Sequence, residues 1–409
     1  MRYYWSIIFL AIFIAPICSE GASSRSFLYQ QTYLQASKEA WQSGAPWAVV
    51  TVASLLNEAN RDLQAGPYSV TQSFHLIPVS GTTPNDFIST GAYWWRNPNT
   101  PDGLPYISRD GHGNPDSAGS FTQLAPMAEA VHRLGLAYFF TGDEAYAQHA
   151  ANLAREFFIT PETRMNPNTE FGGIIPGVSN GSFVVAGIGN SFRRLYEGLG
   201  LIEASFSWTE EDKHAMQGWS KNLLLWMKFS PKCRKESRSP GNHGTNYDMV
   251  AALLSIYSDD MEGAKRYIRH YISRIPLQFA PDGIQPNEML RANNFLYSSY
   301  NLQVAADIAD LGKNFGMDLW NINTAAGAGI RRSINFLAPY MTGNADWIFW
   351  TNETFPPQPG RYHDLLQRAA LGLNNPELLQ AADSLGYGNN TESLVNLTHP
   401  AIILIHNQQ

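Results

Sequence analysis

Apolar residues recur at steps of three and four along most of the chain, which is the spacing of one face of an α-helix. A helical segment is predicted at 121–140 and a second one follows directly at 141–158. Gly142 and Asp143 supply a turn and a helix start between them, so the two segments are expected to form an antiparallel pair. The first apolar stripe consists of Leu124, Met127, Val131, Leu134 and Tyr138.

The same pattern returns at 245–274, where Asp259 and Asp260 separate two more stripes. These stripes are Tyr247, Val250, Leu254 and Tyr257, then Ala264, Tyr267, Ile268 and Tyr271. Further helices are predicted near 27–42, 47–64, 186–206, 209–228, 288–312, 318–339 and 361–385. Because the two-residue alternation of strands is nearly absent, the sequence predicts an all-α fold of helical hairpins closing into a ring or bundle.

Two irregular stretches interrupt the helices, at 66–119 and 160–182. Both are rich in Gly, Pro and Asn, yet the first carries several large aromatic residues, which disordered segments lack. A loop of that length in a compact domain is typically functional. No linker between two self-sufficient units is visible, so residues 21–409 are predicted to form a single domain.

The N-terminus is typical of an export signal. Arg2 precedes an apolar run of about fifteen residues, too short for a comfortable membrane span, and small residues follow it. We therefore expect residues 1–20 to be removed and the mature protein to be secreted, with Cys233 as its one thiol. Four glycosylation sequons fit that location: Asn180, Asn352, Asn389 and Asn396.

Composition narrows the choice of partner. A net charge of −7 argues against nucleic acid, and no Cys/His spacing typical of a zinc site occurs. An anionic substrate would need a local cluster of positive groups, because the field of the whole molecule would repel it.

Asn242 and His243 stand between Gly241 and Gly244, directly before a helical pattern that Thr245 or Asn246 could cap. Unpaired N–H groups at a helix N-terminus favour an anion, so this pair could hold a carboxylate. The alternative is a tight turn with an Asn cap and an incidental His.

A second polar cluster lies at 287–302, where a helix would bring Asn293, Tyr297, Tyr300 and Asn301 to one face, with Arg291 at its beginning. The alternative there is a structural hydrogen-bond network. A third group, in the first irregular stretch, combines arginines with aromatic rings, which suits acidic sugars. Its Trp94–Trp95 pair could instead plug one end of a helical barrel.

Taken in order, several motifs between residues 67 and 302 resemble the alginate-lyase-like polysaccharide lyases with an α/α-barrel. They are "PYSVT", "YWW…P…PDGLPYISRDG…NP", "MNPN…IIPG", "NHGTNYD" and "EMLR……YSSYNL". The resemblance implies an incomplete (α/α) toroid of antiparallel hairpins, with long loops over the end that binds a β-1,4-linked polyuronate. It also implies β-elimination without a metal or organic cofactor, and we expect a monomer.

The resemblance also implies roles. Asn242 and Arg291 would neutralise the uronate carboxylate, while His243 and Tyr297 would share the tasks of base and acid, in a split that the sequence leaves open. The residues expected to bind substrate or support the site are Tyr93, Trp94, Trp95, Arg96, Tyr106, Arg109, Tyr247, Glu288 and Tyr300.

Two other functions compete with this interpretation. A glycoside hydrolase on a similar toroid would need two carboxylic residues facing each other across the bond. The candidates are Asp102, Asp110, Asp116, Glu170, Asp248 and Glu288, and no pair among them is marked out. The second alternative is a carbohydrate-binding relative that keeps the fold and has lost catalytic turnover. The presence of Asn242, His243, Arg291 and Tyr297 together argues against it.

Overall fold

The apolar stripes fold into helices whose bounds mostly follow the sequence pattern. The computed structural model describes residues 23–74, 79–182, 185–349, 357–387 and 393–406, so the expected signal peptide lies outside the described residues. Within those ranges, no helix combines the length and the apolar character needed to cross a membrane. The helices are α1 (Gln31–Gln42), α2 (Pro46–Asp62), α3 (Phe121–Thr141), α4 (Glu144–Phe158), α5 (Ala186–Leu201), α6 (Glu210–Phe229), α7 (Pro231–Glu236), α8 (Asn242–Tyr257), α9 (Met261–Gln278), α10 (Asn294–Lys313), α11 (Ile330–Met341), α12 (Pro359–Leu373), α13 (Pro376–Ser384), α14 (Val395–Thr398) and α15 (Ile402–His406).

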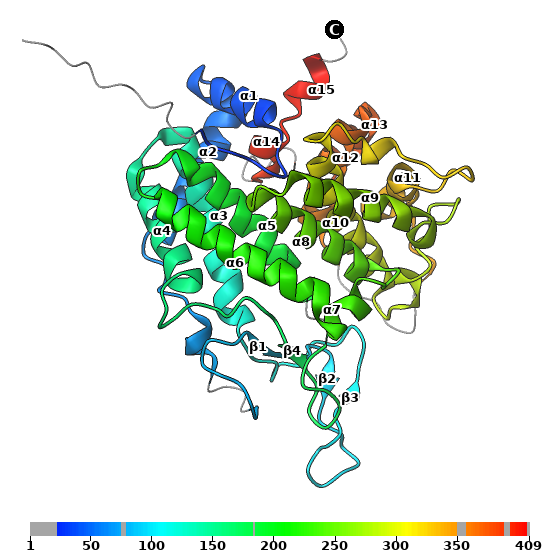
Figure 1. Cartoon of the computed structure of the whole chain (residues 1–409). Coiled ribbons are helices and arrows are strands. Elements are labelled where there is room, and N and C mark those ends of the chain that lie inside the picture. Colours follow the sequence, from blue (N-terminus) through cyan, green and yellow to red (C-terminus); the bar gives the residue numbers. More distant parts are fainter. Residues whose placement is uncertain (1–22, 75–78, 183–184, 350–356, 388–392, 407–409) are drawn as a thin grey trace, which may run out of the picture.

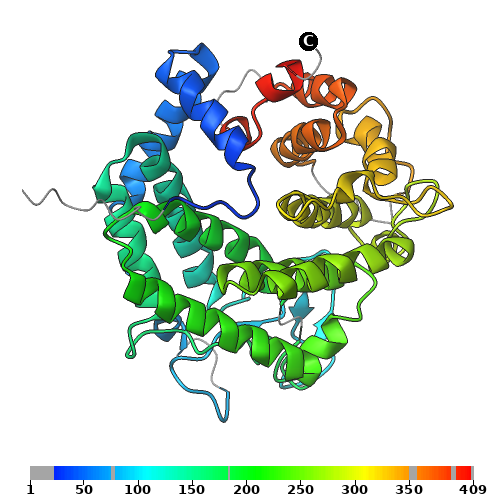
Figure 2. The ribbon, with the colours of Figure 1, turned by 45° about the horizontal axis from the view of Figure 1, so that its top comes forward.

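The helices form a ring, which Figure 2 shows. Helices α3, α5, α8, α10 and α12 contact one another in succession, and α4, α9 and α13 pack against them as hairpin partners. Every residue of α8 except His243 is buried, as expected for an inner helix covered on all sides. The predicted (α/α) toroid is therefore confirmed.

The contact between α3 and α5 depends on two glycines. A Cβ atom at Gly135 would lie 2.7 Å from the carbonyl oxygen of Gly198, and one at Gly198 would collide with the backbone of Val131. Because neither residue has a side chain, the two helix backbones approach closely and fix the angle at which the inner helices pack.

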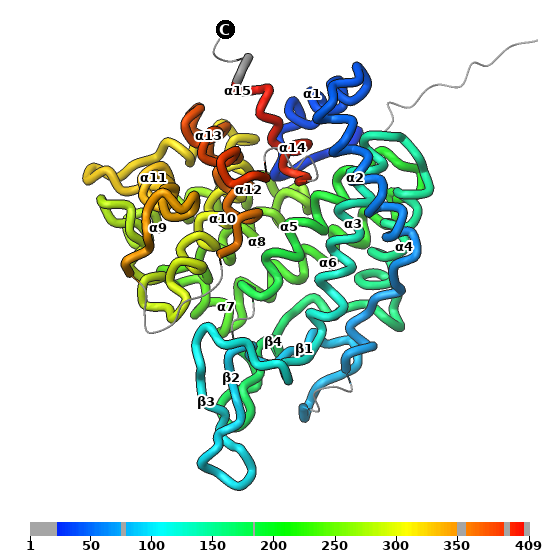
Figure 3. The backbone as a smooth tube through the Cα atoms, turned by 180° about the vertical axis from the view of Figure 1, so that it is seen from behind, coloured from blue at the N-terminus to red at the C-terminus, as the bar shows by residue number. Residues whose placement is uncertain are grey.

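Both ends of the described chain contribute to the ring. Helix α14 contacts α1, α2 and α12, and so joins the first and last hairpins (Figure 3). The segment before α1 runs along α5, where the buried carboxylate of Glu197 accepts the backbone N–H groups of Phe27, at 2.8 Å, and of Leu28. The same carboxylate accepts the Ser26 hydroxyl at 2.7 Å, and burial raises the pKa of Glu197 to about 7.

The two irregular stretches pair with each other at one end of the ring (Figure 1). Strand β1 (Ile88–Thr90), from the first stretch, lies parallel to β4 (Phe171–Ile174), from the second. Strands β2 (Trp94–Trp95) and β3 (Ile107–Ser108) form an antiparallel pair within the first stretch. These short strands give the loops over the ring a fixed shape.

Some predicted bounds are wrong. The expected helix at 318–339 is a 3₁₀ turn at Leu319–Asn321, then a loop, then α11. The expected helix at 361–385 is divided into α12 and α13, because Asn374 adopts a left-handed conformation (φ 51°) that ends α12. Helix α8 begins three residues before the predicted cap at Thr245, and α10 begins only at Asn294.

Replacing Glu197 tests the bond that ties the N-terminal segment to the ring. In Glu197→Ala two buried backbone N–H groups lose their acceptor, so we expect the free energy of unfolding to fall by about 2–5 kcal/mol. In Glu197→Gln the amide oxygen can accept both N–H groups and the amide nitrogen can donate to Ser26. Chemical denaturation should therefore find Glu197→Gln close to the wild type, and equal losses in both variants would contradict this account.

Candidate active site

A cavity of about 640 Å³ opens between the strand-bearing loops and the first turns of the inner helices. Asn242 and His243 reach it from α8, Tyr297 reaches it from the first turn of α10, and Arg291 from the segment just before that helix. The structure therefore brings all four predicted catalytic residues to one cavity. Of the predicted substrate-binding residues, Tyr93, Trp94 and Tyr300 also line it.

Asn242 is held by a carboxylate. Its backbone N–H donates to Glu288 Oε1 at 2.7 Å, and its side-chain amide donates to Oε2 at 2.8 Å. A Cβ atom at Gly241 would lie 2.5 Å from Oε1, which explains the first glycine of the motif. Glu288, expected to bind substrate or to support the site, is buried at the N-terminus of α8, where it holds Asn242. Burial raises the pKa of Glu288, against the effect of these two bonds.

His243 is oriented by Glu236, at the end of α7. Its Nδ1 lies 2.8 Å from Glu236 Oε1, and the same carboxylate accepts the backbone N–H groups of Val185 at 2.7 Å and Ala186 at 3.1 Å. Because an ionised carboxylate only accepts hydrogen bonds, this contact places a proton on Nδ1. The imidazole is 25% exposed, whereas Glu236 is buried, so the ring is held from behind and open to the cavity.

Arg291 forms a two-pronged ion pair with Asp110 from the first irregular stretch. Its Nη2 lies 2.5 Å from Oδ1 and its Nε lies 3.0 Å from Oδ2, which also accepts the N–H of Ala292 at 2.9 Å. Burial opposes the charge on Asp110, but the bonds from Arg291 and Ala292 hold the pKa of Asp110 below its ordinary value. The loop and α10 are thereby locked together at the cavity wall.

Tyr297 lies directly beneath that guanidinium. The Arg291 guanidinium carbon is 3.5 Å from the centre of the Tyr297 ring, and the Tyr297 hydroxyl donates to the Tyr93 hydroxyl at 2.7 Å. Burial raises the pKa of Tyr297 well above its ordinary value, although the cation of Arg291 acts in the opposite direction. Tyr297 is therefore protonated at neutral pH and able to donate.

Tyr300 forms the inner wall of the cavity. Its hydroxyl lies 3.2 Å from Asn246 Nδ2, and the same Nδ2 donates to the carbonyl of Asn242 at 2.9 Å. Asn246 is fully buried on the second turn of α8, so this small network couples the two catalytic helices.

Besides Glu288, five of the predicted substrate-binding residues lie outside the cavity wall. Trp95 donates to the carbonyl of His112 at 3.1 Å, and the guanidinium carbon of Arg109 lies 5.0 Å from the centre of the Trp95 ring. Arg96 is exposed and Tyr106 is half-buried in the same loop. Tyr247 is 6% exposed in the core, beside Tyr267, and its predicted contact with substrate is wrong because its face of α8 is turned toward the outer helix.

The carboxylates considered for a hydrolase are not paired across the cavity. Among the described wall residues, Asp110 is the one acidic side chain, and it is bound to Arg291. Asp248 is buried against Arg274 and His270, and Glu170 pairs with Lys232 at 2.7 Å. Within the described parts of the chain, no group of three or more His, Cys, Asp or Glu side chains is placed to hold a metal ion.

Sequence reasoning missed one residue with a direct role in holding the site. Glu236 lies seven residues before His243, on a short helix that the periodicity did not predict. Asp110 was considered only as a hydrolase acid, and its partner Arg291 lies 181 residues away. No local signal connects residues so distant.

Comparison with solved structures shows a similar overall fold. An alginate lyase from Bacteroides ovatus is 28% identical, with a TM-score of 0.85 over 92% of this chain and 99% of that one. Alginate lyase A1-III from Sphingomonas species A1 is 14% identical, with a TM-score of 0.52 over 92% of this chain and 97% of that one. A variant of A1-III complexed with a tetrasaccharide is 15% identical, with a TM-score of 0.56 and the same coverage.

No curated protein matches the sequence. The family described as Alginate lyase does match, over residues 69–347, which is more than half of the 409 residues and contains the complete cavity wall described above. The chain therefore belongs to the alginate lyase family and is a polysaccharide lyase.

Proposed function

We propose that the protein cleaves a β-1,4-linked polyuronate, such as alginate or glucuronan, by β-elimination without a metal. The observation that carries this proposal is the convergence of Asn242, His243, Arg291 and Tyr297 on one cavity. The family acts on acidic polysaccharides, and its removal of a weakly acidic C5 proton requires these types of side chain.

The reaction assigns a task to each residue. The base removes the C5 hydrogen, its electron pair forms the C4=C5 double bond, the C4–O4 bond breaks, and the acid protonates the departing O4. Removal of that hydrogen becomes easier when hydrogen bonds or positive charge neutralise the neighbouring carboxylate. Asn242 can donate its second amide hydrogen to that carboxylate, and Arg291 can donate from Nη1, since Asp110 engages Nε and Nη2.

The protonation states favour a division of the proton transfers. Tyr297 is protonated and fits the acid that donates to O4. His243 holds its Nδ1 proton toward Glu236, so Nε2 is the atom that would take the C5 hydrogen as base. For a substrate whose C5 hydrogen and O4 lie on one face, Tyr297 could perform both transfers only as the phenolate. It would then take the C5 proton and give the same proton to O4, with His243 as a neutralising group.

Ultraviolet absorbance tests the reaction type. Elimination leaves a conjugated unsaturated uronate, so absorbance should rise on alginate blocks or glucuronan, with chelator present. Tyr297→Phe should lower turnover by about 10²-fold or more while substrate binding persists. Tyr340→Phe removes a tyrosine hydroxyl on α11, away from the cavity wall, and should stay active. New reducing ends without absorbance would identify a hydrolase, and full turnover in Tyr297→Phe would exclude it as the acid.

Glu236→Gln tests how His243 is oriented. A glutamine can donate to Nδ1, which would move the imidazole proton to Nε2 and remove the proposed base, so kcat should fall by about 10²-fold with KM little changed. Glu170→Gln, in a carboxylate that pairs with Lys232 away from the wall, should retain activity. Unchanged kcat in Glu236→Gln on substrates of either C5 configuration would transfer the base role to Tyr297.

We also propose that the mature protein is a secreted monomer comprising one domain from residue 21 onward. Asn180 is exposed in the second irregular stretch, whereas Asn396 is half-buried and accepts from Gln367 at 3.1 Å; Asn352 and Asn389 lie outside the described residues. Mass spectrometry of protein recovered from the medium should find an N-terminus near Gly21 and a glycan at Asn180 before one at Asn396. Retention of residues 1–20 would contradict the export proposal.

A further inference from the structure

A second cavity lies inside the ring, further along α10, the helix that carries Tyr297. Its volume is about 620 Å³, close to the 640 Å³ of the catalytic cavity. Helix α3 lines the catalytic cavity with Phe121 and the second one with Glu129, and α10 does so with Tyr297 and Asp307. These pairs are roughly two to three helical turns apart, so the two cavities are stacked along the inner helices.

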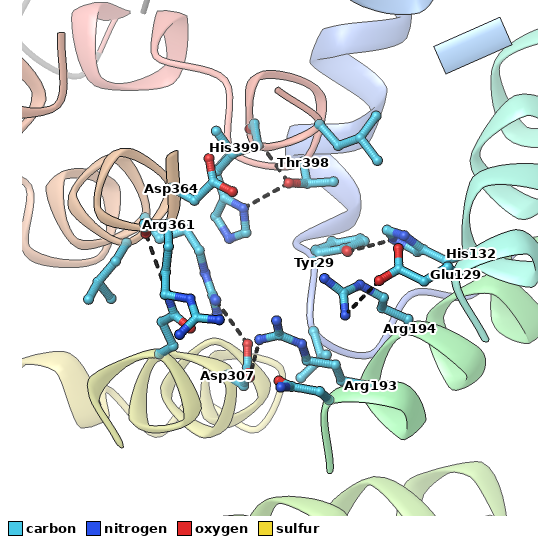
Figure 4. A pocket seen from close by; sticks show the side chains of 17 residues that line it. Tyr29, Glu129, His132, Arg193, Arg194, Asp307, Arg361, Asp364, Thr398 and His399 are labelled. Atoms are coloured by element: carbon cyan, nitrogen blue, oxygen red, sulfur yellow. Dashed lines mark hydrogen bonds and ion pairs between the residues drawn. The ribbon is translucent and has the colours of Figure 1, made fainter. Parts of the chain in front are cut away.

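Four arginines line the second cavity. Arg193 and Arg194 come from α5, and Arg361 and Arg368 come from α12. Figure 4 shows Arg193, Arg194 and Arg361 directed toward the same space from the two helices. Such a concentration of guanidinium groups inside a ring is costly unless each charge is matched.

The carboxylates nearby match most of these charges but not all. Asp307 is shared by Arg193 at 2.8 Å and Arg368 at 2.9 Å. Glu129 is shared by Arg194 at 3.1 Å and by Arg133, which lies outside the cavity wall.

Arg361 is the unmatched cation. It forms no ion pair with the described residues, although it lines the cavity between the inner helices. Asp364, one turn later on α12, instead accepts hydrogen bonds from Ser393 at 2.8 Å and from His363 Nδ1 at 3.2 Å. The guanidinium of Arg361 is therefore available to a ligand.

Repulsion between the arginines also favours binding of an anion in the second cavity. Burial lowers the pKa of Arg361, and repulsion from Arg193 lowers it further. The pKa of Arg194 is lowered by the same two causes. Burial, with Arg194 beside it, lowers the pKa of His132 to about 3, so this imidazole is neutral at physiological pH and the positive charge belongs to the arginines. An anion among them would relieve their repulsion.

We propose that the second cavity binds a small hydroxylated carboxylate, of the class of a uronic acid or a short uronate saccharide. Arg361, with Arg193 beside it, would bind the carboxylate, because a guanidinium presents paired N–H groups that match its two oxygens. Gln303, Thr398 and Tyr29 place further polar groups on the wall for the hydroxyls. The choice of a uronate rests on the proposed function, whereas the anion site itself does not.

D-glucuronate and inorganic phosphate are suitable probes, with D-glucose as the neutral control. Crystals of the mature protein soaked in glucuronate should show its carboxylate within hydrogen-bonding distance of Arg361. In solution, calorimetric titration should find the second-cavity binding weakened about tenfold or more in Arg361→Gln and in Arg193→Gln. Arg331→Gln, in an exposed arginine of α11 away from the cavity, is the matched control and should bind like the wild type.

Results other than these would contradict the anion site, the uronate class or the proposed function separately. Glucuronate found only in the catalytic cavity, or glucose bound as tightly as glucuronate, would remove the anion site. Phosphate bound at Arg361 with glucuronate excluded would remove the uronate class. A protein that binds glucuronate at Arg361 but cleaves no polyuronate would overturn the proposed function and leave this site standing. Thermal unfolding of the variants separates loss of binding from loss of fold.

Discussion

The carboxylate of Glu288 at the N-terminus of α8 is the interaction on which the catalytic cavity depends. It accepts both the backbone and the side-chain N–H of Asn242, and it occupies the end of the helix where the dipole is positive. The sequence suggested that a substrate carboxylate would use this helix end. Glu288 already neutralises this helix end. In the proposed mechanism, the substrate carboxylate must therefore be neutralised by the Asn242 amide and by Arg291, so the placement of these two side chains becomes decisive.

Two further carboxylates each hold one of the candidate catalytic side chains. Their positions show which parts of the site the sequence could predict and which it could not. Glu236 holds His243 and Asp110 holds Arg291, from elements that approach only in the folded ring. The motif residues themselves were recognisable because glycines flank the Asn-His pair and because polar side chains fall on one face of α10. No local sequence pattern identified the carboxylates that hold them. The burial of Tyr247 was equally unpredictable, because a tyrosine can pack in a helical core as readily as it can stack on a sugar ring.

The fold was more predictable than its details, for a physical reason. Each hairpin buries an apolar face whose period is visible in the sequence, so the pairs α3 with α4 and α8 with α9 lie close to their predicted bounds. The prediction of one helix over 318–339 was wrong because apolar residues can be buried in a packed loop as well as in a helix. Pairing of β1 with β4 was also hidden, because it joins residues about 80 positions apart, as the 2.9 Å bond from Gly173 to the Ser89 hydroxyl illustrates.

The two cavities differ in how their charges are matched, and the difference has a chemical consequence. In the catalytic cavity Arg291 is already paired with Asp110, so an incoming carboxylate must share a guanidinium rather than capture a free one. A shared guanidinium stabilises the bound substrate less than a free one would. Its hydrogen bonds to the substrate carboxylate then strengthen in the transition state, as that carboxylate gains negative charge during proton removal. In the second cavity Arg361 has no such partner among the described residues, so the anion bound there would be stabilised as it is. If both proposals hold, Arg291 favours the transition state of the reaction, whereas Arg361 favours a bound anion that does not react.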